Sequence, residues 1–309
     1  MTEKNHQTLV SATGAKLALY AWPAPKNARG VVHINHGMAE HSSRYARFAE
    51  YLNIHGFHVI AHDHRGHGYT VAPGTHLGMF AKRDGWENVL ADIDAVHDHI
   101  EENHPGLPVI YFGHSMGSII GVNYCIRRSE RLAGAALWNS GVDGGPLLFI
   151  LSFLLACERM LKGSDVPSGL AHSVTFKTWN QKFAPNRTDF DWLSRDETEV
   201  DRYVDDPLCG FPTCNGLWRD LLIGIKTGAS NRQLAKIRSD LPIHLLGGGQ
   251  DPCSDNGKAI LRLASRLTKC GVQDVKTYIH PDNRHEALNE TSKDEIMNEF
   301  TRWLDQHIS

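Results

Sequence analysis

Short apolar runs alternate with amphipathic segments along most of this 309-residue chain, and no other feature of the sequence constrains its fold as strongly. The runs at residues 31–36, 109–112 and 135–138 have the length and composition of buried strands. In residues 89–100, apolar side chains recur at gaps of four, three and four, which puts them on one face of a helix. Strands that alternate with helices favour a parallel sheet with right-handed crossovers, so the sequence predicts an α/β fold.

The remaining segments extend this pattern. A hairpin is predicted near the start, where residues 9–10 and 16–22 flank a turn at 12–14. Further strands are predicted at 57–61, 243–246 and 275–279, and further helices at 43–54, 119–126 and 257–267. A last helix is predicted to begin at Ser292, because Ser292 and Glu295 have the spacing of a capping box, in which the serine hydroxyl accepts from the amide of Glu295.

The alternation stops between residues 142 and 238. An apolar segment, a polar stretch and three tryptophans (Trp179, Trp192 and Trp218) follow one another there without a strand pattern. We therefore expect a core that is interrupted by one insertion. The predicted parts are a first core part at 1–141, a mainly helical cap at 142–238 and a second core part at 239–309.

Gly113-His114-Ser115-Met116-Gly117 is the most specific motif in the chain. It lies directly between a predicted buried strand and a predicted helix, which is the setting of a nucleophile elbow. Such a turn holds its serine in a strained conformation, and a Cβ atom at either flanking glycine would collide with the neighbouring chain. We expect Ser115 to be the nucleophile and the motif's other residues to shape the turn. The alternative is a chance match in an ordinary turn.

A serine hydroxyl is a weak nucleophile at neutral pH, so it needs a base, and the base needs a carboxylate that orients it. Asp251 and His285 each follow a predicted strand, at the edge where open α/β sheets carry their sites. We assign Asp251 as the acid and His285 as the base, with Asp255 and Asp282 as alternative acids. Two plainer interpretations stay open: Asp251 as a helix cap, and His285 as a solvated loop residue.

Acyl transfer through a serine also needs backbone amides that stabilise an oxyanion. One is expected from Met116, the residue after the nucleophile. The second is expected from Met38, because Gly37 in the loop His36-Gly37-Met38 permits the amide of Met38 to turn inwards. We expect His36 and Gly37 to shape this side of the site.

Several segments of the chain together form a longer pattern. They are His36-Gly37-Met38-Ala39-Glu40-His41-Ser42-Ser43-Arg44-Tyr45, Asp63-His64-Arg65-Gly66-His67-Gly68, the motif around Ser115, Asp251, and Arg284-His285-Glu286 with Leu288-Asn289-Glu290. This pattern resembles the monoacylglycerol lipase and lysophospholipase branch of the α/β-hydrolases. The resemblance covers both halves of the core and leaves the cap unmatched.

This resemblance implies an eight-stranded, mostly parallel sheet flanked by helices, with a helical lid over the site. It also implies no cofactor, and hydrolysis of single-chain lipid esters such as monoacylglycerols or lysophospholipids. The family often has a small residue where Met38 stands and a serine where Thr70 stands. The first difference would narrow an acyl pocket.

Other chemistries are compatible with parts of the sequence. The same triad would serve a short-chain carboxylesterase, a serine aminopeptidase or an acyltransferase. A metal-dependent hydrolase is a remoter alternative, because His62, His64 and His67 come within one position of a His-x-His-x-Asp-His signature, with Gly66 where the aspartate would stand. A scaffold that only binds a ligand is another, since a fold does not guarantee chemistry.

The apolar segment at 147–161 has two interpretations. It is apolar on nearly all sides, which suits either a helix packed between core and cap or a lid that lines an acyl channel and touches a lipid surface. Cys209 and Cys214 in the cap are expected to be buried thiols. Cys253 is expected close enough to the site for thiol reagents to block entry. The sequence leaves the roles of these three cysteines undetermined.

Composition excludes several classes of partner and location. The chain has 32 basic and 35 acidic residues and a formal charge of −3, so it lacks the excess of positive charge that nucleic-acid binding requires. The longest apolar run, 146–157, is too short for a bilayer, and the start has no leader pattern. The six cysteines lack paired short spacing. We expect a cytoplasmic protein that binds a small lipid ester, touches membranes transiently through the cap, and holds no metal; its oligomeric state is undetermined.

Overall fold

The computed structural model describes residues 6–25 and 27–308. The expectation that the start carries no leader rests partly on residues 1–5, which lie outside this range. The strands are β1 (Gln7–Val10), β2 (Lys16–Trp22), β3 (Gly30–Asn35), β4 (Phe57–His62), β5 (Val109–His114), β6 (Gly134–Trp138), β7 (Ile243–Gly248) and β8 (Val275–His280).

Within the described residues these strands form one eight-stranded sheet in the order β1-β2-β4-β3-β5-β6-β7-β8. β1 and β2 form the predicted N-terminal hairpin, and β2 is antiparallel to β4. All other neighbouring strands are parallel. The predicted eight-stranded, mostly parallel sheet is therefore confirmed.

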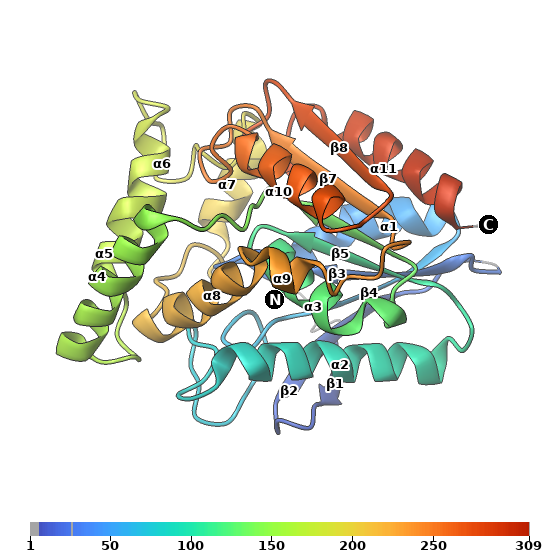
Figure 1. Ribbon diagram of the computed structural model, residues 1–309, viewed down its shortest axis with the longest axis horizontal. Coiled ribbons are helices and arrows are strands. Elements are labelled where there is room, and N and C mark those ends of the chain that lie inside the picture. Colours follow the sequence, from blue (N-terminus) through green and yellow to red (C-terminus); the bar gives the residue numbers. More distant parts are fainter. Residues whose placement is uncertain (1–5, 26, 309) are drawn as a thin grey trace.

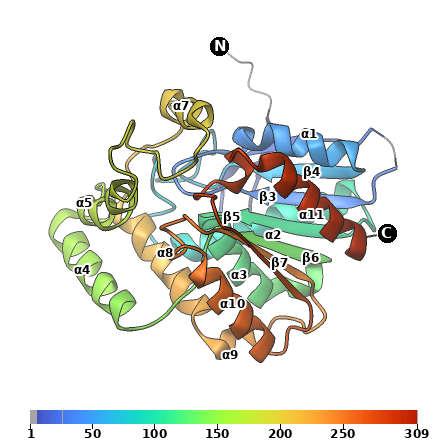
Figure 2. The same cartoon turned by 90° about the horizontal axis from the view of Figure 1, so that it is seen from above.

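Helices cover both faces of the sheet (Figures 1 and 2). One face carries α1 (Ala46–Ile54) and α11 (Lys293–His307), and the other carries α2 (Gly85–Asn103), α3 (Met116–Arg128) and α10 (Lys258–Lys269). Because successive side chains of a strand point to opposite faces, Phe112 of β5 packs with α1 and α11, whereas Tyr111 packs with α2 and α3. The core thus has two apolar layers separated by a buried sheet.

The start of α11 differs from its predicted capping box. Ser292 precedes the helix, but its side chain caps no amide of the first turn. Its hydroxyl instead donates to Oδ1 of Asn283, 2.9 Å away in the loop after β8. The capping-box prediction is wrong because a tertiary partner takes the hydroxyl that the local pattern assigned to Glu295.

The segment between β6 and β7 is helical in the structure. It contains α4 (Pro146–Lys162), α5 (Gly169–His172), α6 (Thr178–Gln181), α7 (Glu197–Asp205), α8 (Asn215–Gly228) and α9 (Asn231–Leu234). Figure 1 shows α4, α5 and α6 at one end of the molecule, beside the sheet layers rather than within them. None of the described helices has the length and apolar character to cross a bilayer.

One helix of this segment packs against the core. Side chains of α8, including Trp218 and Leu221, share an apolar cluster with α2 and α3, and the side-chain amide of Asn123 in α3 donates from Nδ2 to the carbonyl of Gly224 at 3.0 Å. α8 therefore connects the inserted helices to the sheet layers. The division into core and cap at residues 142 and 238 stays a prediction.

Candidate active site

Ser115 occupies the turn between β5 and α3, where its φ is 52° and its ψ is −113°. Residues other than glycine rarely adopt a positive φ, so this turn is strained. The amide of Ser115 donates to the carbonyl of Trp138 at 3.0 Å, which attaches the turn to β6. A Cβ atom at Gly113 would lie 2.3 Å from the carbonyl oxygen of Gly117, and one at Gly117 would lie 2.1 Å from that of Asn35. Both positions therefore require glycine.

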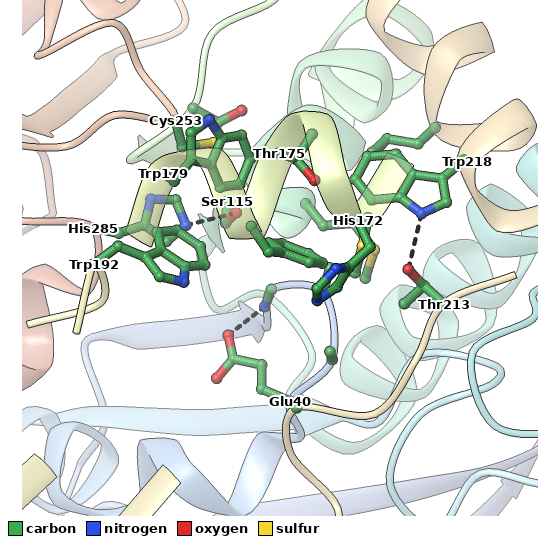
Figure 3. Close-up of a pocket in the computed structure, with 18 of the residues that line it drawn as sticks. Glu40, Ser115, His172, Thr175, Trp179, Trp192, Thr213, Trp218, Cys253 and His285 are labelled. Carbon is green, nitrogen blue, oxygen red and sulfur yellow. Dashed lines mark hydrogen bonds between the residues drawn. The ribbon is translucent and has the colours of Figure 1, made fainter. Parts of the chain in front are cut away.

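Two long-range hydrogen bonds connect Ser115, His285 and Asp251. Oγ of Ser115 lies 2.9 Å from Nε2 of His285, and Figure 3 marks this hydrogen bond. Nδ1 of His285 lies 3.0 Å from Oδ1 of Asp251. The hydroxyl donates to Nε2 and the Nδ1–H group donates to the carboxylate, which is the tautomer that a base for Ser115 needs. The side chains of His285 and Asp251 are both buried.

The electrostatics of the pair keep Asp251 ionised. Burial lowers the pKa of His285, but the charge and hydrogen bond of Asp251 outweigh burial and raise this pKa above its ordinary value. Burial raises the pKa of Asp251, but His285 and hydrogen bonds from Ser254 and Cys253 outweigh it, so the net pKa is lowered. The imidazole of His285 therefore holds a proton more readily than a free histidine does, beside the negative charge of Asp251.

The structure distinguishes the alternatives that the sequence left open. Asp255 is exposed and forms an ion pair with an arginine of α10, and Asp282 is exposed in the loop after β8. Asp251 does not cap α10, whose N-cap residue is Gly257. His285 is 3% exposed, so its interpretation as a solvated loop residue is wrong. The carboxylate that reaches the imidazole is that of Asp251.

The loop after β3 brings the amide of Met38 to the same place. Met38, Ser115 and Met116 line one cavity. The amide of Gly37 donates to Oε1 of Glu40 at 2.6 Å, which orients the loop (Figure 3). Across residues 6–25 and 27–308, the amides of Met38 and Met116 donate to no other group. Both are available for an oxyanion, and their role as its donors stays a prediction.

Ser115 opens into a cavity of about 580 Å³ with a mainly apolar lining. The apolar side chains come from the loop after β3, from α3 and from the helices and loops between β6 and β7, and they include Met38, Ile119, Leu148, Leu151, Phe176, Trp179, Trp192, Phe211, Trp218, Leu221, Leu222 and Ile225. Such a lining with a few polar groups is typical of small-molecule sites.

Trp192 connects this lining to the base. Its ring centroid lies 4.7 Å from that of His285, and its carbonyl accepts from the amide of His285. Trp179 and Phe176 pack against the same indole. The sequence singled out Trp192 only as one of three tryptophans in the insertion, because nothing local in the pattern indicates contact with a residue 93 positions further along.

Comparisons with known proteins agree with this geometry. Residues 26–292 match the family described as "Serine aminopeptidase, S33". The chain belongs to this family of α/β-hydrolases.

Relatives of this family member include two curated lipases. The chain is 28% identical over 305 residues to "Monoglyceride lipase" of Homo sapiens, covering 97% of this chain and 90% of the relative. It is 27% identical over 311 residues to "Monoacylglycerol lipase" of Mycolicibacterium smegmatis, covering 99% and 98%. The predicted resemblance to the monoacylglycerol lipase branch is thereby confirmed.

Solved structures include close matches to this α/β-hydrolase. A thermostable carboxyl esterase from Bacillus coagulans, in complex with glycerol, has a TM-score of 0.89 at 25% identity, covering 98% of each chain. A monoglyceride lipase from Saccharomyces cerevisiae has a TM-score of 0.75 at 18% identity, covering 98% of this chain and 95% of that one. The second match shows the fold alone, and both agree with the predicted fold class.

A buried ion network beside the triad was not singled out from the sequence. The guanidinium of Arg44 lies 2.5 Å from Oε2 of Glu40 and 2.8 Å from Oε2 of Glu286. Burial raises the pKa of Glu286, but Arg44 outweighs burial and lowers it to about 2, whereas burial raises the pKa of Glu40. This network attaches the loop of Met38 to the loop of His285. One sequence feature could have indicated this network: Glu40, Arg44 and Glu286 all lie within the motif segments that also contain the predicted site residues.

The two histidines predicted to shape the site have different surroundings. Nδ1 of His36 donates to the carbonyl of Gly37 at 2.7 Å, and its Nε2 accepts from the amide of His64 at 2.9 Å, so His36 holds two loops together. His114 lines the cavity with its ring centroid 4.9 Å from that of His285. Burial and the neighbouring His285 lower the pKa of His114 to about 3, so this ring is neutral.

The histidine-rich loop after β4 does not assemble the metal site considered from the sequence. Among the described residues, two groups hold three ligand atoms within 4.8 Å of one another, and neither includes His62, His64 or His67. Nδ1 of His62 faces a histidine of β3, and Nδ1 of His67 donates to the backbone. Burial lowers the pKa of His62 and of His67 to about 4. The rings of His62 and His67 are therefore neutral and buried.

Proposed function

We propose that the protein is a serine hydrolase that cleaves carboxylic esters of single-chain lipids, monoacylglycerols or lysophospholipids, through an acyl-enzyme on Ser115. The observation that carries the proposal is the hydrogen-bonded series Ser115–His285–Asp251 opening onto an apolar cavity of about 580 Å³. The names of the two curated lipase relatives support the same substrate class.

The mechanism follows from the protons and charges in this series. His285 takes the proton of Ser115 as Oγ attacks the ester carbonyl, and Asp251 stabilises the imidazolium that forms. The amides of Met38 and Met116 donate to the developing oxyanion. His285 then protonates the leaving alcohol, and a water molecule, deprotonated by the same imidazole, releases the fatty acid from Ser115.

A serine aminopeptidase is the second candidate, because the matched family carries that description. An aminopeptidase needs a carboxylate that is free to bind the substrate's α-ammonium group. The carboxylates closest to the cavity, Glu40 and Glu286, are both paired with Arg44. The pairing favours a neutral alcohol group over an ammonium group in this part of the site.

α4 supports contact with a lipid surface. Leu148 and Leu151 line the cavity, whereas Phe149 and Phe153 on the same helix are 73% and 63% exposed. One helix thus has an apolar side toward the cavity and another toward solvent, which is the arrangement expected of a lid that receives lipid from a surface. The six cysteines are free thiols, which supports a reducing compartment such as the cytoplasm.

A hydrolysis profile tests the substrate class. Monoacylglycerols, lysophospholipids, short p-nitrophenyl esters and aminoacyl amides are compared, with the Ser115→Ala protein as blank. We expect the highest kcat/KM on a single-chain lipid ester and labelling of wild type, but not of Ser115→Ala, by a fluorophosphonate. Preference for aminoacyl amides would support the aminopeptidase instead.

A second experiment tests the lid surface. The double variant Phe149→Ser, Phe153→Ser should hydrolyse a dispersed short ester at the wild-type rate and hydrolyse monoacylglycerol embedded in phosphatidylcholine vesicles more slowly. Equal loss on both substrates would mean that the two side chains have a structural role only.

A further inference from the structure

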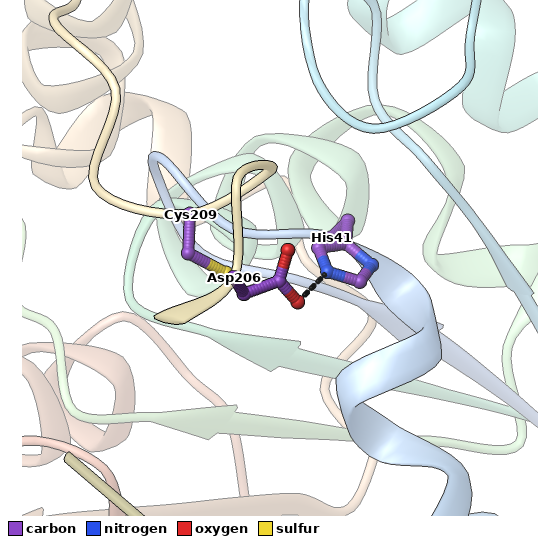
Figure 4. A group of neighbouring side chains, drawn as sticks. All are labelled: His41, Asp206 and Cys209. Atoms are coloured by element: carbon purple, nitrogen blue, oxygen red, sulfur yellow. Dashed lines mark hydrogen bonds and ion pairs between the residues drawn. The ribbon is translucent and has the colours of Figure 1, made fainter. Parts of the chain in front are cut away.

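His41, Asp206 and Cys209 bring three metal-ligating side chains together outside the catalytic series (Figure 4). Their ligand atoms all lie within 4.8 Å of one another, and Nε2 of His41 is 2.8 Å from Oδ2 of Asp206. Imidazole, carboxylate and thiolate are the ligand types that Zn²⁺ takes in proteins. His41 and Cys209 are buried and Asp206 is partly exposed, so two ligands are held in the interior and the third faces solvent.

Further contacts orient each ligand. The hydroxyl of Ser43 lies 2.9 Å from Nδ1 of His41. The amide of Leu208 donates to Oδ1 of Asp206 at 2.9 Å, which leaves Oδ2 directed at His41. The amide of Cys209 donates to the carbonyl of Asp206 at 2.9 Å, so the two ligands share one turn. Contacts of this kind orient the ligands of metal sites.

We propose that His41, Asp206 and Cys209 form a binding site for one Zn²⁺ or a similar borderline divalent cation, with water in the fourth position. As the cation binds Nε2 of His41, the imidazole proton moves to Nδ1, where the oxygen of Ser43 accepts it. The thiol of Cys209 loses its proton to solvent, and Asp206 is already a carboxylate. Binding therefore releases one proton.

The charges around the site permit a cation to enter. A surface pocket of about 270 Å³ includes His41, Ser43 and Asp206, and three arginines line it as well. Each of these arginines is paired: Arg44 with Glu40 and Glu286, and Arg47 and Arg202 with Glu199. The carboxylate of Asp206 and the thiolate that forms at Cys209 then balance the charge of a divalent ion.

The site joins two segments that border the cavity. His41 lies three residues after Met38, and Gly210, directly after Cys209, donates to the carbonyl of Ala39 at 2.9 Å. Gly210 and Phe211 line the cavity. A bound cation would therefore cross-link the loop of Met38 to the inserted segment opposite it. We expect it to stabilise the fold by linkage and to slow lipid turnover by restricting that segment. The effect on turnover rests on the proposed function, whereas cation binding does not.

Cobalt titration tests the ligands directly, because a thiolate bound to Co²⁺ gives a charge-transfer band in the near ultraviolet. The full chain, reduced with a phosphine, is titrated with Co²⁺ alone, and Zn²⁺ affinity is measured by competition. We expect one equivalent to produce the band and Zn²⁺ to remove it. Cys209→Ser should abolish the band and weaken Zn²⁺ binding by at least roughly 100-fold, the upper end of what losing an orienting partner costs. Ser43→Ala should weaken it about tenfold.

Cys157→Ser is the matched control, because Cys157 is a partly exposed thiol that belongs to neither ligand cluster of the described residues. It should keep the band and the affinity. Asp206→Asn provides a second test if Cys209→Ser does not fold, since its amide oxygen can still accept from Leu208; it should also weaken Zn²⁺ binding. A wild-type protein without the band, or a band that survives in Cys209→Ser, would overturn the site even if lipid hydrolysis is as proposed. Binding as expected without any hydrolysis would instead count against the proposed function.

Discussion

Two substitutions of Ser115 separate the strain of the turn from the chemistry of the hydroxyl. Ser115→Ala and Ser115→Gly both remove Oγ and its hydrogen bond to His285. Only Ser115→Gly also removes the Cβ atom that makes a φ of 52° with a ψ of −113° unfavourable. Any difference in stability between the two variants therefore reports the backbone conformation of residue 115.

The magnitude follows from two opposing terms. A residue other than glycine in such a conformation costs on the order of 1–3 kcal/mol. Glycine offsets part of this gain by about 0.5–1 kcal/mol, because its unfolded chain has more conformational freedom. The free energy of unfolding of Ser115→Gly should thus exceed that of Ser115→Ala by roughly 0.5–2 kcal/mol. For a chain of 309 residues that corresponds to a rise in Tm of roughly 1–3 °C.

Urea unfolding and thermal melting of both variants provide the measurement. Ser118 supplies a matched control pair, because it lies in the first turn of α3 with ordinary helical neighbours, and Ser118→Gly should be less stable than Ser118→Ala by up to about 1 kcal/mol. Both Ser115 variants should lose turnover by roughly 10⁴ to 10⁶. If Ser115→Gly melts at or below Ser115→Ala while the Ser118 pair behaves as expected, the argument for a strained elbow is refuted.

Four further predictions follow from the same geometry. Asp251→Asn should lower kcat about 10⁴-fold while the circular dichroism spectrum is unchanged; an unchanged rate would assign the role to another carboxylate. Because Asp251 raises the pKa of His285, and only the neutral imidazole accepts the serine proton, kcat/KM should fall as pH drops through that raised pKa. In Asp251→Asn the inflection should move to lower pH, and a pH–rate profile that does not move would contradict this coupling. Gly117→Ala should destabilise the protein by about 3 kcal/mol or more, because the new Cβ would lie 2.1 Å from a backbone oxygen. Gly144→Ala is the control: its new Cβ would have only a side-chain neighbour at 3.4 Å, so stability should change by about 0.5 kcal/mol or less. The pKa of about 4 at buried His62 lies below the unfolded value of 6.5, so the contribution of this histidine to stability is present above pH 6.5 and decreases as pH falls. At pH 5 the decrease should be on the order of 2 kcal/mol. Between pH 7 and pH 5, urea unfolding of His62→Asn should show a smaller loss of unfolding free energy than urea unfolding of the wild type, and an equal loss would exclude this histidine as a cause.

Most secondary structure could be predicted because its determinants are local. The periodicity in 89–100 lies within α2, and the apolar run at 109–112 lies within β5. The capping box failed for the opposite reason, since the hydroxyl of Ser292 bonds to Asn283 across a loop. α8 was predicted as part of a separate cap, but its contact with α2 and α3 depends on how the insertion folds back onto the core.

The candidate site divides in the same way. Ser115 and its two glycines could be predicted because a sharp strand-to-helix turn imposes steric demands on five consecutive residues. The roles of Glu40, Arg44 and Glu286 could not be predicted, because they depend on ion pairs between residues that are brought together only by the fold. The contact between the rings of Trp192 and His285 has no signature in the sequence pattern around either residue.

The amino-acid order by itself determined the alternation that makes a parallel sheet, and it placed a serine, a carboxylate and an imidazole after strands that end on one edge. Tertiary structure decided which carboxylate meets the imidazole, how the inserted helices enclose the cavity, and that His41 approaches Cys209. The physical reason is range. Periodicity and steric demands act over a few neighbouring residues, whereas the contact between Ser115 and His285 spans 170 residues and exists only after strand order and helix packing are set.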